Sequence, residues 1–253
     1  MAGAFTKTQR RKGQVKFFRN QQIEELAEAR LAELERLVGK PLTPPIPIDL
    51  LAERILELNF LWDQIDELPG EMILGALIPK KRLVVLNEKR RGLFQQKPGL
   101  ERSTKGHEMG HWDLFVDKAT LDHPALFGVD EQGPFAFRSC PAGEVTVLKI
   151  LQSSPEGQEL LRKMNSRADE SSEARAVNRY AAAISMPKAL LREEALKIDR
   201  TKWPNLYRLA EQFGVNISAL RVRLEQLDLL RIGSNNVLYE SRDKAVGQGA
   251  LNL

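Results

Sequence analysis

The spacing of apolar residues along the chain predicts a protein built mainly from helices. Between Asn20 and Val38, isoleucine and leucine recur at helical spacing, and Gly39 follows as a stop signal. A proline-rich segment then forbids regular structure until Asp49, which can cap a second helix to about Leu58. Further helices are predicted at about 100–115, 156–164, 168–184, 206–213 and 218–229.

Short segments rich in strand-forming residues interrupt this helical pattern. Residues 72–78 and 82–86 lie on either side of Pro79, Lys80 and Lys81, which indicates a small antiparallel hairpin. A second hairpin is predicted where 230–232 and 237–239 are joined across a short turn. We therefore expect an α+β fold that is mainly helical, with a small antiparallel sheet.

Changes in composition along the chain suggest three parts. Residues 1–47 form a basic N-terminal arm and a helix with a proline-rich linker, 48–200 form the central domain, and 201–253 form a C-terminal segment. In the last part, two helices separated by Gly214, Val215 and Asn216 have the spacing of a helix-turn-helix. The irregular stretch 117–141 is long enough to border a cleft, although an insertion without a role is equally compatible with its composition.

Composition and charge restrict where the protein works. The 253 residues are 42% hydrophobic, which is enough for a sizeable core. Cys140 is the one cysteine, so no internal disulfide can form and a reducing, cytoplasmic location is expected. No apolar run has the length of a signal or a membrane span, so no membrane partner is expected. The net charge of +4 is concentrated in the first nineteen residues, which favours a basic arm over a nucleic-acid contact.

The segment from Arg102 to Trp112 contains the motif H-E-x-x-H, formed by His107, Glu108 and His111. Residues four apart on a helix lie one turn above each other, so both imidazoles can bind one Zn²⁺ at about 2.0–2.1 Å. Glu108 is then placed as the catalytic carboxylate, beside the water that the cation activates. The chain has only three histidines, so a chance match on a surface helix is disfavoured. Gly110 forms helices poorly, which indicates close packing there.

A catalytic zinc site also needs a third protein ligand. The residues after His111 lack the Gly and His of the extended metzincin motif, so this ligand must come from elsewhere. The candidates are Asp169, Glu170 and Glu173 on a later helix, and His123 and Cys140 in the irregular stretch. We favour Glu173, because Tyr180 and Ala183 continue its stripe toward the interior of the protein.

Three blocks of sequence resemble the ImmA/IrrE family of metallo-endopeptidases. The first is the strand 82–87 followed by 102–111, which carries the histidines. The second, 178–187, is similar to the family's Asn-x-aromatic-Ala-Ala-x-Leu-Leu-Met-Pro, and the third, 209–224, resembles the helical segment after the peptidase core. Together the blocks cover roughly residues 50–230.

This resemblance implies a zinc peptidase directed at one regulator, commonly a helix-turn-helix transcriptional repressor. His107, Glu108 and His111 match the family pattern without adjustment. The family's zinc-binding glutamate stands four residues before the Asn of the second block, where this chain has Ala174, and Glu173 lies one residue earlier. A one-residue shift rotates a helical side chain by about 100°, so Glu173 reaches the metal only if the helix is bulged or starts differently.

The expected function is limited proteolysis of a protein substrate, with one Zn²⁺ per chain and with a transcriptional repressor as the implied substrate. The hairpin 72–87 could align that substrate by strand addition, or it could only close the core.

Two other functions compete with proteolysis. In a DNA-binding regulator with structural zinc, Arg221 and Arg223 would contact phosphates, but Glu225 and Asp228 in the same segment disfavour nucleic acid. In a toxin–antitoxin or phage module, the metal domain would chiefly bind a partner.

Overall fold

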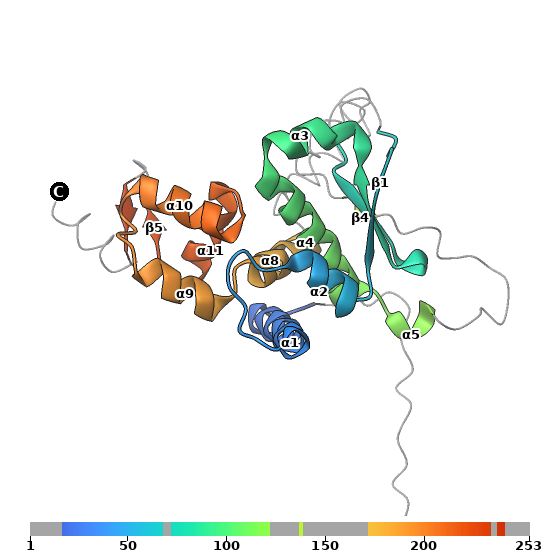
Figure 1. Cartoon of the computed structure of the whole chain (residues 1–253), viewed down its shortest axis with the longest axis horizontal. Helices are drawn as coiled ribbons and strands as arrows, with labels where there is room; N and C mark the ends of the chain where they lie inside the picture. The colour runs from blue at the N-terminus through green and yellow to red at the C-terminus, as the bar shows by residue number, and fades with distance from the viewer. Residues whose placement is uncertain (1–16, 68–71, 122–136, 139–171, 234–236, 241–253) are drawn as a thin grey trace, which may run out of the picture.

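The computed structural model describes residues 17–67, 72–121, 137–138, 172–233 and 237–240 of the chain (Figure 1). The helices of its first half are α1 (Asn20–Val38), α2 (Ile48–Arg54), α3 (Arg91–Gln96), α4 (Pro98–Phe115) and α5 (Lys118–Leu121). Those of its second half are α8 (Ser172–Ser185), α9 (Lys188–Leu196), α10 (Trp203–Phe213) and α11 (Ile217–Gln226). The 3₁₀ turns η1 (Pro79–Lys81) and η2 (Glu88–Arg90) flank one strand of the sheet. The mainly helical α+β class predicted from the sequence is confirmed.

One sheet of four strands lies beside the helices, in the order β1-β3-β2-β4. The predicted hairpin is present as β2 (Gly75–Ile78) and β3 (Leu83–Asn87), which pair antiparallel. The sheet is mixed rather than purely antiparallel, because β1 (Asn59–Asp63) pairs parallel with β3. On the other side, β4 (Phe137–Arg138) pairs with β2 at Ala76 and Leu77. The backbone of β2 is therefore already paired there, so the hairpin cannot add a substrate strand at these positions.

The main hydrophobic cluster joins α1, α2, α4, α8 and the sheet. The predicted helix 20–38 is present with the predicted bounds, and Gly39 ends it with a positive φ of 69°. Its buried side chains Ile23, Ala27 and Leu34 belong to the same cluster as Trp112 of α4. Burial of this apolar stripe fixes α1 against the helices that carry the candidate site.

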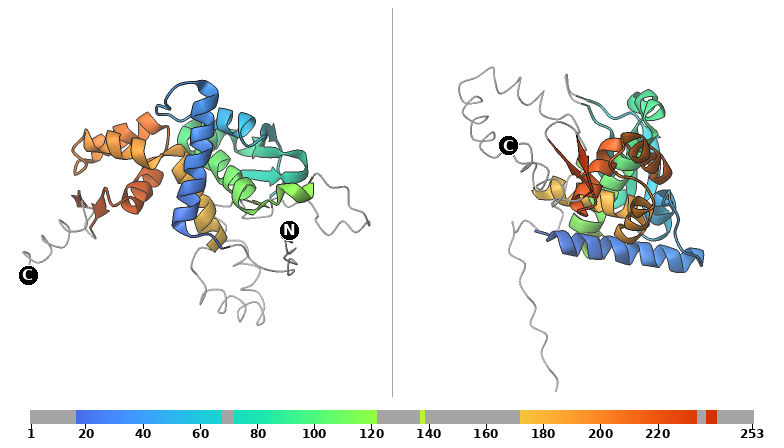
Figure 2. Two further views of the ribbon diagram at one scale, coloured as in Figure 1. Left: turned by 90° about the horizontal axis from the view of Figure 1, so that it is seen from below. Right: turned by 90° about the vertical axis from the view of Figure 1, so that its left-hand side faces the viewer.

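A second hydrophobic cluster is formed by what we call the C-terminal module: α9, α10, α11 and the hairpin of β5 (Arg231–Ile232) and β6 (Leu238–Tyr239). The predicted helix-turn-helix spacing is present in α10 and α11. The buried residues of the cluster begin at Met186, so α9 packs with the helices after it. The divisions proposed at residues 47 and 200 remain predictions, and side chains pack across both of them. From below, α1 crosses between this module and the rest of the protein (Figure 2).

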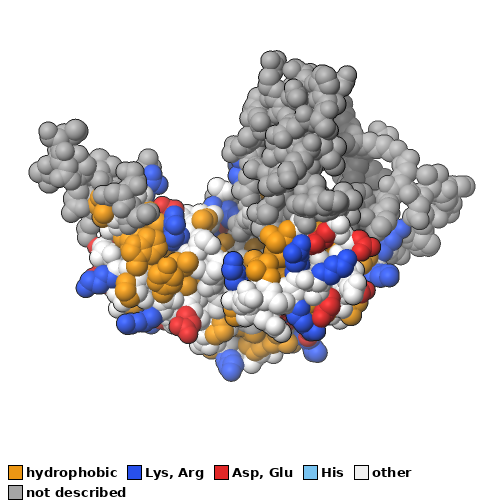
Figure 3. Space-filling model, turned by 90° about the horizontal axis from the view of Figure 1, so that it is seen from above, with side chains coloured by type: hydrophobic (Ala, Val, Ile, Leu, Met, Phe, Trp, Pro, Cys, Tyr) orange, Lys and Arg blue, Asp and Glu red, His pale blue; other side chains and the backbone are white. Residues whose placement is uncertain are grey.

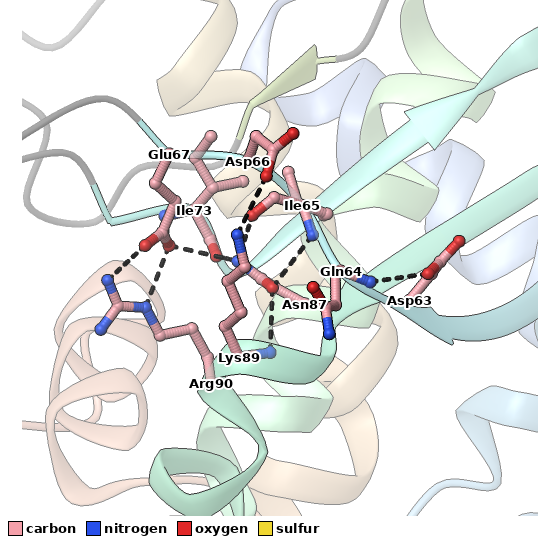
Figure 4. A network of polar contacts seen from close by, with 9 residues as sticks. All are labelled: Asp63, Gln64, Ile65, Asp66, Glu67, Ile73, Asn87, Lys89 and Arg90. Atoms are coloured by element: carbon pink, nitrogen blue, oxygen red, sulfur yellow. Dashed lines mark hydrogen bonds and ion pairs between the residues drawn. The ribbon is translucent and has the colours of Figure 1, made fainter.

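Asn87 at the end of β3 organises the segment that leads into β2 (Figure 4). Its side chain is fully buried, and its amide nitrogen donates to the carbonyl of Ile73 at 2.9 Å and to Glu67 at 3.1 Å. Its amide oxygen accepts from the backbone N–H of Ile65 at 3.2 Å. Glu67 also pairs with Arg90, which holds the pKa of this carboxyl below its usual range. These bonds fix where β2 starts beside α4.

Asp113 joins four helices through one buried carboxylate. It accepts two hydrogen bonds from Arg30 of α1, both at 2.9 Å, one from Lys118 of α5 at 2.8 Å and one from the hydroxyl of Tyr180 of α8 at 3.0 Å. Burial alone would raise the pKa of Asp113, but Arg30 and Lys118 hold it below its usual range. The carboxylate is therefore charged at neutral pH and ties α1, α5 and α8 to α4.

Among the helices that the structure describes, none combines the length and the apolar character that a bilayer span requires. The predicted helix 156–164 lies outside the described residues, as does most of the irregular stretch 117–141.

We predict that Asp113→Asn lowers the free energy of unfolding by about 3 kcal/mol at pH 7, because it leaves the Arg30 guanidinium without its buried partner. Urea denaturation followed by circular dichroism measures this loss. Since the folded pKa is lowered, the contribution of Asp113 is present above its unfolded pKa of about 3.9 and disappears as pH falls through the folded value. The difference between the variant and the wild type therefore narrows in acid. The exposed Lys197→Met is the control and leaves the midpoint unchanged; equal midpoints for Asp113→Asn and wild type would contradict the prediction.

Candidate metal centre

The close approach of α4 and α8 is made possible by two glycines of α4. A Cβ added to Gly106 would lie 3.2 Å from the Cβ of Ala181, and one added to Gly110 would lie 3.1 Å from the carbonyl oxygen of Val177. Both distances are tighter than ordinary van der Waals contact, so a larger residue would push the helices apart. The close packing expected at Gly110 is confirmed. Each glycine directly precedes a histidine of the motif, so α8 lies beside both rings.

The two histidines face each other through their Nε2 atoms. The Nε2 atoms of His107 and His111 are 3.2 Å apart, close to the roughly 3.3 Å that separates two ligands about 2.0–2.1 Å from a tetrahedral zinc. His111 is almost fully buried. Burial, reinforced by the ring of His107, lowers the pKa of His111 to about 3, so this imidazole is neutral at pH 7. A neutral imidazole is the form that binds a metal.

Glu173 is brought to the histidines from the first turn of α8. This helix starts at Ser172 within the described residues, and the carboxylate oxygen Oε1 of Glu173 lies 3.3 Å from Nδ1 of His111. Burial raises the pKa of Glu173. The Glu173 carboxylate contacts the ring of His111 at Nδ1 and not beside the two Nε2 atoms. Among the described residues, no group of three His, Cys, Asp or Glu side chains is arranged to hold a metal ion. The side chain is 37% exposed, which leaves it room to change rotamer.

Asn178 orients His107. The Nδ1–H of His107 donates to the amide oxygen of Asn178 at 2.9 Å. This bond fixes the tautomer in which Nε2 carries the lone pair, on the side of the ring that faces His111. Asn178 lies on the same helix as Glu173, so α8 supplies a partner to each histidine.

Glu108 lies between α4 and the start of β2 and has no exposed surface. A Cβ added to Gly75 of β2 would lie 3.7 Å from Cγ of Glu108 and 2.9 Å from Cγ2 of Thr104. Gly75 thus allows the sheet to approach α4 closely and covers the carboxylate from that side. The carboxylate is therefore shielded from bulk water, on the helix that also carries the two histidines.

The histidines open into a cleft of about 1050 Å³. One wall carries His107, His111, Glu173 and Asn178 of α4 and α8. Another wall is formed by α11 of the C-terminal module, and the residues that it contributes are Ser218, Ala219, Val222 and Gln226. A cleft of this size is large enough to hold a segment of a bound molecule and not only a single ion.

Arg223 does not have the position that a phosphate contact requires. Its guanidinium is fully buried and binds both carboxylate oxygens of Glu24 in α1, at 2.6 and 2.7 Å. The guanidinium of Arg221 lies 5.9 Å from the ring of Trp203. On the face of the module visible in Figure 3, hydrophobic side chains are interspersed with basic and acidic ones. The assignment of Arg223 to DNA is therefore wrong, because the side chain is used inside the protein.

The structure brings three of the four predicted site residues together, namely His107, His111 and Glu173. Glu108 is fully buried on the same helix and is not among the residues that line the cleft. The other candidates for the third ligand lie outside the described residues: Asp169, Glu170, His123 and Cys140. Sequence reasoning missed the contact of Asn178 with His107 and the wall formed by α11. The Asn178 contact could have been suspected, because this polar residue lies within two turns of Glu173 on the same helix. The position of α11 opposite the histidines joins residues more than a hundred positions apart, and the sequence carried no signal for it.

Comparison with known proteins gives little further information. No protein-family model matches the chain, and no curated protein matches it. One solved structure, titled "Mycobacterium tuberculosis transcriptional regulator", is similar over 88% of this chain at 14% identity, with a TM-score of 0.43. The chain spans 56% of the length of that structure. The family resemblance drawn from the motifs therefore stays a prediction.

Proposed function

We propose that the protein is a zinc-dependent endopeptidase that performs limited proteolysis. The observation that carries this proposal is the 3.2 Å separation of the two Nε2 atoms on one wall of a cleft. The buried Glu108 follows His107 on the same helix. Such paired imidazoles satisfy the spacing of two zinc ligands, whereas structural zinc sites prefer closed, thiolate-rich coordination. A cytoplasmic location and a transcriptional repressor as substrate belong to the same proposal.

The donor set fits zinc with one adjustment. His107 and His111 would bind through Nε2, and Glu173 would complete a His₂Glu set after rotating from Nδ1 of His111 toward the cleft. When bound, the cation supplies Lewis-acid activation of water and of the peptide carbonyl. One ion per chain is expected from this donor set.

The remaining chemistry belongs to the chain itself. The Glu108 carboxylate accepts a proton from the attacking water and then delivers it to the nitrogen of the leaving amine, so the residue ends each cycle in its starting state. Glu108 is fully buried between α4 and β2 and does not line the cleft, so its carboxylate has to turn toward the histidines to reach that water. Asn178 holds His107 in the orientation that the reaction needs.

The DNA-binding alternative has the arrangement of α10, α11 and the β5–β6 hairpin in its favour. Against it, Arg223 is buried against Glu24 and cannot contact a DNA phosphate. The third alternative, a toxin–antitoxin or phage module in which the metal domain chiefly binds a partner, differs from a peptidase only in lacking turnover. Turnover by the wild-type protein with zinc bound is therefore the measurement that separates a peptidase from such a module.

Replacement of Glu108 by Gln is expected to keep zinc and lower cleavage about 10²–10⁴-fold, because the amide preserves size but cannot accept the proton. Cleavage of a proteome-derived peptide library, followed by mass spectrometry, measures turnover, and elemental analysis measures zinc. Glu101→Gln, on the partly exposed face of the same helix, is the matched control with full activity. Unchanged turnover in Glu108→Gln would reject the mechanism, and absence of turnover in the wild type with zinc bound would favour a binding module.

We expect Glu173→Ala to weaken zinc binding by more than 100-fold, measured by competition with a chromophoric chelator. A loss of only about 10–100-fold is typical of a group that orients a ligand. Such a loss would mean that Glu173 orients His111 and does not itself bind the metal. The double variant Glu173→Ala, Ala174→Glu moves the carboxylate to the position that the family resemblance assigns. Full recovery of affinity in this double variant would contradict Glu173 as the ligand that the chain is built to use.

The third metal prediction concerns Asn178. Asn178→Ala should lower zinc affinity about 10–100-fold, since His107 loses the acceptor that fixes its tautomer. Asn178→Asp keeps an oxygen acceptor and should recover most of that affinity. The same chelator competition reports both variants, and thermal unfolding shows that the fold is intact. Equal losses in the Ala and Asp variants would mean that Asn178 acts through packing and not through its hydrogen bond to Nδ1.

A further inference from the structure

The helix α11 belongs to the candidate site although it lies in the C-terminal module. Its residues Ser218, Val222 and Gln226 are spaced four apart, so they form one stripe on one face. These side chains line the cleft that also contains His107 and His111. The opposite face of α11 is buried through Leu220 and Leu224 in the core of the module.

An ion pair across two parts of the fold fixes the orientation of α11. Arg223 binds Glu24 of α1 through both terminal nitrogens, and its Nε donates to the carbonyl of Met186 at 3.1 Å. Arg179 of α8 reaches the same carboxylate at 2.9 Å. Burial alone would raise the pKa of Glu24, but the two arginines hold it below its usual range. Rotation of α11 would leave a buried guanidinium unpaired, which is strongly unfavourable.

The other end of α11 is fixed by backbone contact. A Cβ added to Gly99 in the first turn of α4 would lie 2.6 Å from the backbone nitrogen of Asn216 and 2.8 Å from the carbonyl carbon of Val215. Only glycine permits this approach. The turn before α11 therefore rests directly on the helix that carries the histidines, and the two walls of the cleft are held at a set separation.

This geometry is unsuited to reading DNA. A recognition helix must protrude so that its outer face enters a major groove about 12 Å wide. The outer stripe of α11 is instead turned toward α4 and α8 across the cleft, and it carries no charged side chain: its members are Ser218, Ala219, Val222 and Gln226. The stripe therefore offers apolar contact and uncharged hydrogen-bonding groups rather than the positive charge that a phosphate backbone requires.

We propose that α11 is the specificity wall of the cleft, where Val222 and Ala219 contact an apolar side chain of a bound, extended polypeptide. This inference rests on the proposed peptidase function and names the determinant of its substrate choice. Val222 is 52% exposed and lines the cleft, so its side chain is accessible to a bound segment. Leu74 and Leu100 line the same cleft and extend its apolar surface, while Gln226 and Ser103 offer uncharged partners for peptide backbone groups.

Peptide capture by the full-length Glu108→Gln protein tests this inference without requiring turnover. The immobilised protein is incubated with a proteome-derived peptide library, and bound peptides are identified by mass spectrometry. The parent should enrich peptides with Leu, Ile, Met or Phe at one fixed position. Addition of Val222→Glu should reduce that enrichment at least 10-fold and favour Lys or Arg there. Leu196→Glu is the matched control: it places the same charge on an exposed apolar position of the C-terminal module outside the cleft, and it should capture the parental set.

The possible outcomes separate this inference from the proposed function. Capture of no peptide by the parent, or of the same set by Val222→Glu, would overturn it. Salt-dependent binding of a labelled DNA duplex that Val222→Glu abolishes would also overturn it, because the stripe would then read nucleic acid. Wild-type protein could capture peptides in the Val222-dependent way and yet neither bind zinc nor cleave them. In that case the peptidase proposal is wrong, and the assignment of α11 as the specificity wall is retained.

Discussion

The contact between α4 and α8 at Gly106 and Gly110 is the constraint on which the candidate site depends. The two glycines are one turn apart and each precedes a histidine, so the surface that lets α8 approach lies beside the surface that carries the imidazoles. With a Cβ at either position the second helix would move outward, and the side chains that it supplies would no longer reach the rings. The packing of α8 against α4 therefore also brings the side chains of the site together.

Two buried charge networks hold the surroundings of this contact in place. Asp113 ties α1, α5 and α8 to α4 below the histidines, and Glu24 ties α1 to α8 and α11 beside the cleft. Both use α1, which the sequence presented as a helix between a basic arm and a proline-rich linker. Through these pairs α1 acts as a brace between the helices of the site and the C-terminal module (Figure 2). Buried pairs of this kind stabilise weakly compared with apolar packing, but they penalise any other arrangement of the helices.

The helix-turn-helix-like geometry illustrates why shape alone does not decide function. The turn, the helix lengths and the following hairpin have the expected form. However, the helix that would read DNA has its outer stripe in the cleft, and one of its two arginines, Arg223, is buried inside the protein. Docking against α1 and α4 makes this common packing unit one wall of the cleft.

Much of the architecture followed from local sequence signals. The period of the apolar residues gave α1 and its end at Gly39, the strand formers around Pro79 gave the β2–β3 hairpin, and the H-E-x-x-H spacing placed two imidazoles on one face of a helix. These features depend on residues within a few positions of one another, so the sequence by itself determined them. The parallel pairing of β1 with β3, the approach of Glu173 and Asn178 to the rings, and the burial of Arg223 against Glu24 each join distant segments. Only the tertiary structure decided them. The local sequence around an arginine, an asparagine or a short apolar run is the same whether the residue faces water or contacts a partner that folding brings from a distant segment.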